Sequence, residues 1–587
     1  MNIKLSFDLL TLEVFYQEIY KSLIDAIVEK IYQIGNTEVF INLYSPSLGR
    51  INLILSVHPQ LYRIQLTKRD FPYPIKPPSF AMLLRKYLEG ARLLDINLIP
   101  QERIIEFRWK RAFDEDKKLI LELMGKYSNL ILLNENNIII DAIKHVTSEI
   151  SRFREILPWI PYIYPPKTQK FSLIGLTDEN LEEIFKKDIP LKDLLLREIS
   201  HMNPQIVKEI SGELSNKTPS MLTEDEKSLL KERIFLYKEK VIKKDFKFIV
   251  YLINNEPITY SLFPLKEYEH LKKKEFDKLY KAIDFIYSYA FEKILFDQEK
   301  KKLSDVVKNN IKKVEDKIRE FETQIKEGEE AEIFRIKGDA LLLNQKNIRK
   351  GIEKIILPNP YNPEEFLEIV LDPSLSSIEN AQKYFKKYKK LKKGISILKK
   401  QKERLEEELY YLHSLDYSLE NTDSLLGLKE IGEELEKEGY IREKKEKEKR
   451  KEKKSEPHKF LSSDGFEIYV GKNNKQNEYI TFHLANPEDI WLHARGIPGA
   501  HTIIKTGEKE PPETTILEAA TLAGYFSKGR DSTYVSVDYT KRKYVQKPKG
   551  AKPGFVIYRN EKTIFVKPEE ALRFFPEGIQ DSLKILR

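Results

Sequence analysis

The chain has 587 residues, 101 Lys and Arg against 92 Asp and Glu, and no cysteine. Without cysteine it cannot build disulfides, thiolate zinc sites, iron–sulfur clusters or a cysteine nucleophile. The net charge of +9 is modest for this length, so local clusters of charge have to indicate the partner. The length predicts about three to five domains.

No stretch of the sequence approaches the roughly 18 uninterrupted apolar residues that a membrane span requires. At the N-terminus, Asp8 precedes any apolar segment, which is unlike the pattern of a signal peptide. These features predict a soluble, cytoplasmic, multidomain protein without a membrane partner. The overall prediction is an α+β multidomain chain.

Residues 1–170 predict a mixed α/β domain. Helical spacing of apolar residues covers 7–30 and 80–88, and proline clusters at 72–78 and 158–166 interrupt the pattern. Short β-like runs occupy the rest of the domain, at 38–43, 50–57, 62–66, 103–109, 119–124 and 129–133.

Residues 171–240 predict a helix-hairpin-helix domain. Short helical patterns at 191–199 and 204–214 flank the connection 200–203, and the prolines at 190 and 204 suit first helical turns. A β-hairpin follows, with strands predicted at 246–253 and 258–262.

Residues 241–440 predict a long antiparallel coiled-coil hairpin with an insert in the middle, at 330–375. The first heptad seam runs through Val307, Ile311, Val314, Ile318, Phe321 and Ile325. A second seam covers 385–412, and its helix opens with a capping box formed by Ser376 and Glu379. Such an arm is suited to spanning distance, and a purely structural or dimerising coiled coil is the alternative.

Charged residues fill 442–454, nine of them basic and four acidic, within the predicted linker 441–456. This stretch cannot form a packed core, so it is either a solvated tether or helix, or a segment with affinity for nucleic acid. Residues 457–587 predict a compact β-rich domain with a helix at 513–527. Its predicted strands are 466–470, 479–484, 490–494, 534–537, 555–558 and 564–566.

Searches for enzyme motifs find no Walker loop, dinucleotide fingerprint, HExxH motif or nucleophile elbow. His483, His493 and His501 lie close together, but their separations of ten and eight residues match no metal-site spacing. Histidines that are satisfied by backbone groups or stacked on bases are the better interpretation. The sequence therefore predicts no catalytic residue, no metal site and no cofactor.

Two segments of the last domain have features of an RNA-binding surface. In a strand, Trp491, His493 and Arg495 would share one face, which suits base stacking and phosphate contact, although Trp491 alone is more typical of a core. Tyr539 and Tyr544 accompany a second segment, so we favour RNA contact there over a solvated charged face. That segment holds six basic residues and no acidic residue among them: Lys541, Arg542, Lys543, Lys547, Lys549 and Lys552.

The segment 489–501 resembles the signature of the RNA-binding domain of the NFACT family. It is flanked, in the family's order, by 470–477, 537–540 and 547–550, and it adds Lys472 and His501 to the candidate RNA-binding residues. Three more segments resemble the family's N-terminal domain, and two are similar to its second coiled-coil arm. They are 56–59, 77–90 and 151–158, and then 371–373 and 379–388.

The resemblance implies a role in ribosome-associated quality control. Such proteins bind a large ribosomal subunit, at rRNA and the stalk-base region, while peptidyl-tRNA still obstructs it, and they recruit alanyl-tRNA. The ribosome then adds a C-terminal alanine tail without mRNA. Because ribosomal RNA forms the peptide bond, the family member is a tRNA-recruiting factor and not an enzyme.

The resemblance also implies a set of tRNA-binding residues: Asp8, Glu102, Arg103, Glu122, Lys126, Tyr127 and Asn129. Four positions depart from the family pattern, since Leu9 stands for glycine, Glu102 for aspartate, Lys126 for arginine and Tyr127 for histidine. Glu102 carries its carboxylate one methylene further out, and Lys126 lacks the bidentate fork of arginine. Tyr127 keeps a ring but loses imidazole protonation. These changes concern the identity of the tRNA more than the general role.

Two other functions stay open. The family's older label suggests a surface adhesin that binds fibronectin, which requires export. The first domain together with the helix-hairpin-helix is similar to the DNA glycosylase fold, which suggests nucleic-acid repair or a scaffold. No catalytic proline follows Met1, however.

Overall fold

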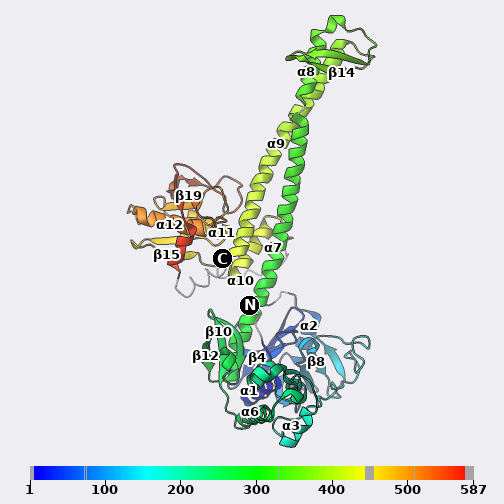
Figure 1. The fold of residues 1–587 in the computed structure, drawn as a ribbon, viewed down its shortest axis with the longest axis vertical. Helices are drawn as coiled ribbons and strands as arrows, with labels where there is room; N and C mark the ends of the chain where they lie inside the picture. Colours follow the sequence, from blue (N-terminus) through cyan, green and yellow to red (C-terminus); the bar gives the residue numbers. More distant parts are fainter. Residues whose placement is uncertain are drawn as a thin grey trace. The chain divides into compact units, whose positions relative to one another are not determined.

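The computed structural model describes residues 5–71, 73, 76–329, 331–442, 455–507 and 509–575. The chain divides into two compact units, residues 1–294 and 295–587 (Figure 1). Residues 443–454 of the predicted basic linker lie outside the described ranges.

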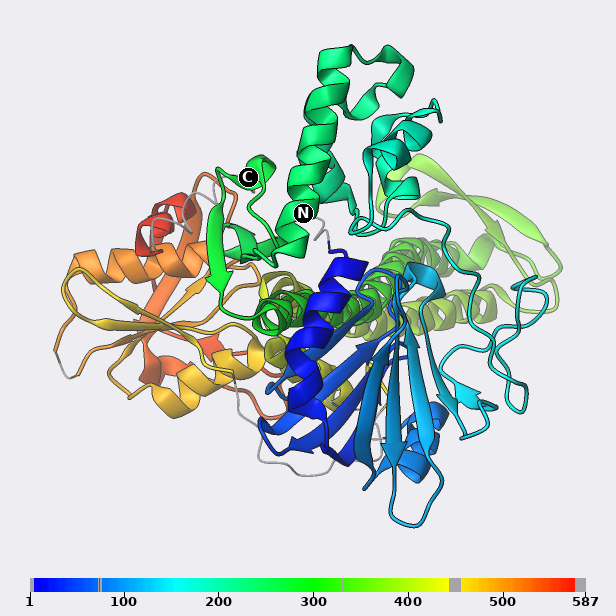
Figure 2. The same cartoon turned by 90° about the horizontal axis from the view of Figure 1, so that it is seen from below.

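A nine-stranded antiparallel sheet forms the body of the first unit (Figure 2). Its order is β4-β3-β2-β1-β5-β6-β7-β8-β9, so β1 and β5 are the neighbours that are not consecutive in the chain. Helix α1 (Leu9–Leu23) contacts β5, and α2 (Ser79–Leu88) contacts β1 and β9. The strands are β1 (Ile27–Ile34), β2 (Glu38–Ser45), β3 (Gly49–Ser56), β4 (Arg63–Thr67), β5 (Arg92–Leu98), β6 (Ile104–Lys110), β7 (Lys117–Glu122), β8 (Asn129–Leu133) and β9 (Ile139–Ala142).

The helix predicted over 7–30 is wrong in its second part. α1 ends at Leu23, and Asp25 has a left-handed φ of 65°, which a continuing helix does not allow. Residues 27–34 then pair with β2 as a strand. Apolar residues on both sides of this break extended the helical pattern into the strand.

Four helices follow the sheet: α3 (Asp178–Phe185), α4 (Leu191–Glu198), α5 (Pro204–Ser211) and α6 (Glu224–Ile242). α4 and α5 lie where the two short helices were predicted, and they contact each other. A three-stranded antiparallel sheet in the order β11-β10-β12 completes this part, with β10 (Phe248–Ile253), β11 (Glu256–Ser261) and β12 (Lys272–Phe276).

The first turns of helix α7 (Leu279–Glu329) are part of the core of the first unit. Gln65 of β4 donates from Nε2 to Asp284 Oδ1 at 2.9 Å and to Ser288 Oγ at 2.7 Å. The guanidinium of Arg63 lies 5.3 Å from the ring centroid of Tyr287 and 3.3 Å from the carboxylate of Glu38. These side chains fix the start of α7 against the sheet.

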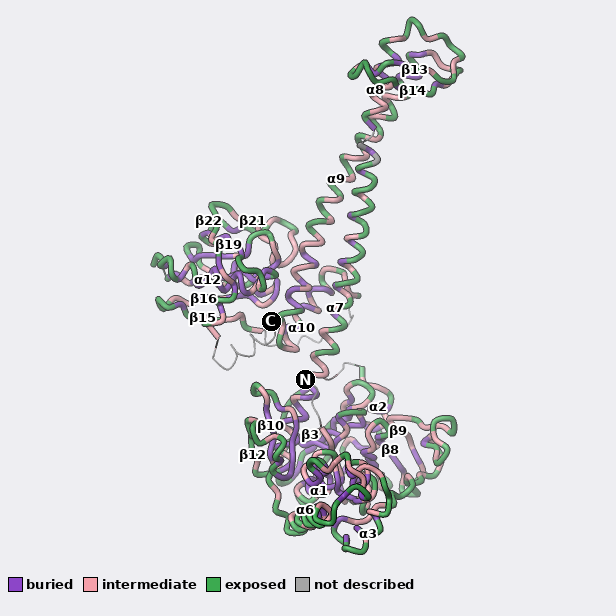
Figure 3. The backbone as a smooth tube through the Cα atoms, viewed as in Figure 1, coloured by how far each residue is buried: buried purple, intermediate pink, exposed green. Residues whose placement is uncertain are grey.

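The second unit contains the rest of α7 and helix α9 (Ser377–Asn421), which form the predicted antiparallel hairpin. Its apolar seam joins Val307, Ile311 and Val314 to Leu412 and Leu415. The distal half of the hairpin carries few buried residues (Figure 3). By the helical rise, the 45 residues of α9 are about 68 Å long.

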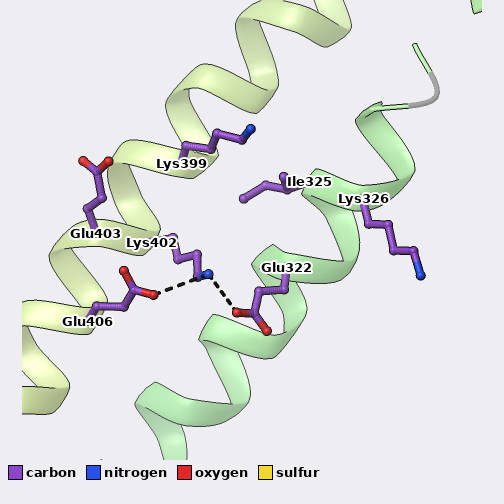
Figure 4. Close-up of a pocket in the computed structure, with 7 residues that line it drawn as sticks. All are labelled: Glu322, Ile325, Lys326, Lys399, Lys402, Glu403 and Glu406. Carbon is purple, nitrogen blue, oxygen red and sulfur yellow. Dashed lines mark ion pairs between the residues drawn. The ribbon is translucent and has the colours of Figure 1, made fainter. Parts of the chain in front are cut away.

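Farther along the arm, ion pairs and close contacts at glycines replace the apolar seam between the helices. Lys402 of α9 lies 2.8 Å from Glu322 of α7 and 3.4 Å from Glu406, beside a shallow pocket between the two helices (Figure 4). A Cβ atom at Gly328 would lie 2.8 Å from the Ile395 side chain, and one at Gly338 would lie 2.8 Å from Phe385. α7 therefore approaches α9 closely at Gly328, and the following helix α8 (Glu332–Leu343) approaches α9 closely at Gly338.

The insert between the arm helices is a small folded element. It consists of α8 (Glu332–Leu343) and the antiparallel pair β13 (Lys354–Asn359) and β14 (Asn362–Val370), packed around Leu341, Leu357 and Ile369. After α9, helix α10 (Leu425–Lys437) packs against the base of the hairpin.

The last domain has a six-stranded antiparallel sheet in the order β15-β16-β18-β17-β19-β22. Helix α12 (Glu513–Tyr525) packs on one face, and helix α11 (Asn474–Tyr479) precedes a π-helical turn at Ile480–Leu484 on the other. The strands are β15 (His458–Leu461), β16 (Glu467–Val470), β17 (Ile490–Ala494), β18 (Thr502–Lys505), β19 (Val535–Lys541) and β22 (Lys562–Val566), with the short pair β20 (Val545–Gln546) and β21 (Ile557–Tyr558) beside them.

The strand predicted at 479–484 is wrong, because these residues end α11 and form the π-helical turn. Ile480, Phe482 and Leu484 alternate as in a strand, but Asn473 starts a helix by accepting the amide of Gln476 at 2.9 Å.

In the described ranges, no helix has the length and apolar character that crossing a bilayer requires.

Candidate nucleic-acid interfaces

Glu102 and Arg103 lie at one end of the nine-stranded sheet, directly before β6. Glu102 Oε1 accepts hydrogen bonds from the backbone amide and the hydroxyl of Thr168, at 2.9 and 3.1 Å. Arg103 Nη1 lies 3.4 Å from the hydroxyl of Tyr62, and its guanidinium is 5.8 Å from that ring. Arg103 is thus held by an aromatic side chain, and its charge is available to a phosphate.

The connection between β7 and β8 forms a tight turn next to Tyr62. Gly125 has φ of 61° and starts the 3₁₀ turn Gly125–Tyr127, and a Cβ atom there would lie 4.0 Å from the Tyr62 ring. Lys126 Nζ is 4.9 Å from the Tyr127 ring, and both side chains are exposed. Tyr62 therefore brings the turn and Arg103 together as one surface with two cations and an exposed ring.

Glu122 and Asn129 flank this turn, but they are buried. Glu122 accepts hydrogen bonds from both terminal nitrogens of Arg154, at 2.7 and 2.5 Å, and from the Tyr162 hydroxyl at 2.8 Å. Asn129 Oδ1 accepts the backbone amide of Lys144, and its Nδ2 donates to the Lys144 carbonyl at 2.8 Å. The predicted direct contact of Glu122 and Asn129 with tRNA does not fit this burial; in the structure they hold the turn.

Lys144 ties the turn to the end of β3. Its Nζ donates to the carbonyl of Val57 at 2.8 Å and to that of Ser128 at 2.9 Å. Burial lowers the pKa of Lys144, and the two carbonyl oxygens satisfy its ammonium group. This lysine is a support for the surface and not a part of it.

Asp8 has a structural partner set of its own. Its Oδ1 accepts the amide of Thr11 at 2.7 Å and so caps α1, and its Oδ2 accepts from Asn203, the N-cap of α5. Asp8 thereby joins two helix starts, and neither of these hydrogen bonds involves Glu102 or Arg103.

In the last domain, the face of β17 that was predicted to meet RNA is mostly internal. Trp491 is completely buried and His501 is 2% exposed, while His493 stacks on Trp491 with ring centroids 5.8 Å apart. Burial lowers the pKa of His493 to about 4 and lowers that of His501, so both imidazoles are neutral. Base stacking by Trp491 or His501 does not fit this burial.

Arg495 is the exposed residue of this set, at the end of β17. Its Nη1 donates to Thr563 Oγ1 at 3.1 Å and its Nε lies 3.8 Å from Asp538 Oδ2, but 59% of its side chain is accessible. Lys472 is partly exposed at the start of the loop before α11. Both remain available to an anionic ligand.

The basic segment 541–552 is compensated by acidic residues from elsewhere in the fold. Glu488 lies 2.8 Å from Lys541 and 2.6 Å from Lys543, which lowers the pKa of Glu488 to about 2. Lys547 pairs with Glu478 and Lys552 with Glu438, at 2.8 and 2.9 Å. Four of the six cations are therefore paired, although no acidic residue lies within the segment, because their partners come from outside it.

Arg542 and Lys549 differ from the other members of this segment. Arg542 Nε donates to the carbonyl of Thr481 at 2.9 Å, and its guanidinium lies 5.2 Å from the Phe482 ring, so it fastens the π-helical turn. Lys549 is exposed and has no ion-pair partner among the described residues.

Two family models account for most of the chain. Residues 8–454 match the NFACT N-terminal and middle domains, and residues 456–560 match the NFACT protein RNA binding domain. The chain belongs to the NFACT family. The RNA-binding domain of this NFACT chain thus contains the β17 face and all but the last part of the six-stranded sheet.

Close relatives match over nearly the whole chain. The Rqc2 homolog RqcH of Bacillus subtilis is 35% identical over 94% of this chain and 96% of its own length. The Rqc2 homolog RqcH of Streptococcus suis is 34% identical, over 96% of this chain and 99% of its own length. A solved C-terminal structure of the fibronectin/fibrinogen-binding protein from Streptococcus suis is 34% identical and covers 46% of this chain and 95% of that one, with a TM-score of 0.37.

Sequence reasoning missed the residues that assemble the surface of the NFACT N-terminal domain. Tyr62, Lys144 and Arg154 come from three separate segments, and a single sequence carries no signal that joins them. Arg154 lies within 151–158, which resembles a family segment, but that match assigned it no role. In the parts of the chain that the structure describes, no three His, Asp or Glu residues gather as a metal site would require.

Proposed function

We propose that this NFACT chain is a ribosome-associated quality-control factor. It binds a large ribosomal subunit that peptidyl-tRNA still obstructs, and it recruits a tRNA charged with alanine. The ribosome then extends the stalled peptide with alanine, without mRNA. The chain acts in the cytoplasm, uses no cofactor and is not an enzyme, because ribosomal RNA forms the peptide bond.

The observation that carries this proposal is the similarity to an Rqc2 homolog over 94% of the chain, with all domains in one order. A match over the full length supports a shared role better than a match to one domain, because each domain alone could serve other functions. Ribosome quality control is the coarser part of the proposal, and the identity of the amino acid as alanine is its finer part.

The surface formed by Arg103, Lys126 and Tyr127 supports tRNA recruitment. Two cations can contact phosphates while the exposed ring of Tyr127 stacks on a base, which is the usual chemistry of single-stranded RNA recognition. Glu102 is held by Thr168 beside this surface and can accept from a base edge or a ribose hydroxyl.

The test is the double variant Glu102→Ala/Arg103→Ala in a reconstituted system with obstructed large subunits and charged tRNA. We expect alanine tailing to be lost while the circular dichroism spectrum stays unchanged. Wild-type binding to tRNA should also weaken steeply with salt, because phosphate contacts release counterions.

The matched control is Glu29→Ala/Arg50→Ala, which removes an exposed ion pair of the same two residue types, 3.0 Å apart. Glu29 lies on β1 and Arg50 at the start of β3. This variant should tail like wild type. If the Glu102→Ala/Arg103→Ala variant still adds alanine tails, the proposed tRNA-binding site is wrong. If the wild-type chain does not bind obstructed large subunits, the proposed function is wrong.

A further inference from the structure

The C-terminal domain contacts α9 and α10 through three consecutive polar residues at the start of α11. Asn473 Nδ2 donates to Glu430 Oε2 at 2.8 Å. Asn474 Nδ2 donates to Ser414 Oγ of α9 at 3.0 Å and to Glu434 Oε1 of α10 at 3.1 Å. Lys475 lies 2.8 Å from Glu433. Every contact in this row crosses from the RNA-binding domain to the arm.

The two asparagines are buried, although they lie within 470–477, which flanks the segment that resembles the signature of the RNA-binding domain. Each is 3% exposed. Asn473 Oδ1 also caps α11 by accepting the backbone amide of Gln476. A carboxamide that is buried and already bonded on both of its atoms is not open to RNA. The role of Asn473 therefore lies inside the protein.

Glu434 is the centre of the contact. It is 1% exposed, and its Oε1 accepts from the Tyr411 hydroxyl at 2.8 Å as well as from Asn474. Its Oε2 has no hydrogen-bond partner among the described residues. A second carboxylate placed next to Glu434 would be strongly repelled, because burial removes the water that screens like charges.

The loop 552–554 of the RNA-binding domain makes a second set of contacts next to the first. Lys552 pairs with Glu438 at 2.9 Å, and its Nζ lies 4.9 Å from the Tyr411 ring. A Cβ atom at Gly554 would lie only 3.0 Å from Asn474 Oδ1, so this loop packs directly on the asparagine. Contacts at two separated segments of the domain restrict its rotation on the arm as well as its distance.

We propose that Asn473 and Asn474 are positioning residues, which fix the orientation of the RNA-binding domain on the base of the arm and do not contact RNA. The domain and the arm then present their surfaces to a ligand as one body. This inference rests on the contacts of the second unit alone and holds whether or not the proposed function is right.

The orientation can be measured directly, because the cysteine-free chain accepts two unique spin labels. Glu407→Cys on the arm and Glu561→Cys on the domain are exposed attachment sites in the full-length protein. Pulsed electron resonance should give one narrow distance distribution. At pH 9, well above the pKa of about 7 of Glu434, Asn474→Asp sets a second carboxylate against an ionised Glu434, and we expect the distribution to broaden at least twofold.

Adding Glu434→Gln to Asn474→Asp should restore the narrow distribution, because it removes the opposing charge. A role limited to stability would lower the urea midpoint of Asn474→Asp while the distance distribution of the folded protein stayed narrow. Asn560→Asp, an exposed change of the same kind in the same domain, is the control and should leave the distribution narrow. An unchanged distribution in folded Asn474→Asp, or no rescue, overturns the proposal.

If Asn474→Asp loses its near-ultraviolet dichroism and so fails to fold, the second asparagine gives the same comparison. Asn473→Asp opposes Glu430, which is less buried, and Glu430→Gln is its rescue. Broadening that Glu430→Gln reverses supports the proposal, and a narrow distribution in Asn473→Asp overturns it.

Discussion

Two sets of ion pairs, one from each unit, differ in how far they are buried. In the first unit, the pairs Arg63–Glu38 and Arg154–Glu122 have side chains that are 11% exposed or less. In the second, Lys541 and Lys543 share Glu488 with side chains that are 38 to 50% exposed. Buried pairs cannot exchange partners, whereas exposed pairs can give way to a phosphate or a counterion. The two buried pairs therefore hold the fold of the first unit in place, and the pairs around Glu488 remain exchangeable.

The largest effect is expected from Arg154→Met, which leaves Glu122 buried without its cation. Removing one partner of a buried pair costs about 3–5 kcal/mol, so urea unfolding of the first unit should shift to a clearly lower midpoint. Adding Glu122→Gln should recover much of the loss. A shift no larger than that of an exposed pair would contradict the contrast between the units.

Glu434→Gln tests how the buried carboxyl group of Glu434 changes the stability of the second unit with pH. Burial raises the pKa of Glu434 from 4.5 to about 7, so the folded state binds this proton more tightly than the unfolded chain. Its stability contribution is present below pH 4.5 and is lost as pH rises through about 7. Tyr411 from α9, Glu438 on α10, Lys475 from α11 and Lys552 face the group.

We expect Glu434→Gln to remove this pH dependence and to exceed wild type by about 1–3 kcal/mol at pH 8, measured by urea unfolding at pH 5 and 8. Glu433→Gln, a more exposed neighbour, is the control. If wild type and Glu434→Gln lose stability equally between the two pH values, the buried carboxyl does not titrate as described.

Glu488→Gln releases Lys541 and Lys543 for a ligand. Binding of the full chain to a short RNA should tighten several-fold at low salt, and the plot of log affinity against log salt should steepen by about one to two units. Fluorescence anisotropy over a salt series measures both. An unchanged slope would show that these lysines do not meet phosphate.

The smallest effect is expected from Lys243→Ala, which removes an exposed partner of Glu239 on α6. Solvent and salt screen such a pair, so the urea midpoint should not change measurably. A clear shift at this site would mean that exposure is a poor guide to the worth of a pair in this chain.

Much of the fold could be predicted from the sequence where one period dominates. The heptad seam from Val307 to Ile325 predicts the arm because a spacing of three and four leaves one apolar stripe, and β8 follows from a short apolar run. The turn at Asp25 escaped prediction, because apolar residues continue across it and only the backbone reverses. The strand predicted at 479–484 failed for the opposite reason, since a capped helix start outweighs a short alternation.

The candidate sites were harder to predict than the fold. Residue types indicated cations and aromatic rings near 103, 126 and 541–552. The sequence could not show which of these side chains already have a partner within the protein. Glu488 neutralises two lysines from 53 and 55 residues away, and Arg154 takes up Glu122 from 32 residues away. Burial and partnership are properties of the assembled chain, so they lie beyond a single sequence.

Gly328 of α7 and Gly338 of α8, which both lie against α9, have a consequence for how such chains diverge. Each faces a bulky residue, Ile395 or Phe385, at a distance that leaves no room for a methyl group. A side chain gained at 328 is tolerable once 395 has become small, and the same holds for 338 and 385. Among relatives, we expect these two pairs of positions to covary, with the sum of side-chain volumes kept nearly constant.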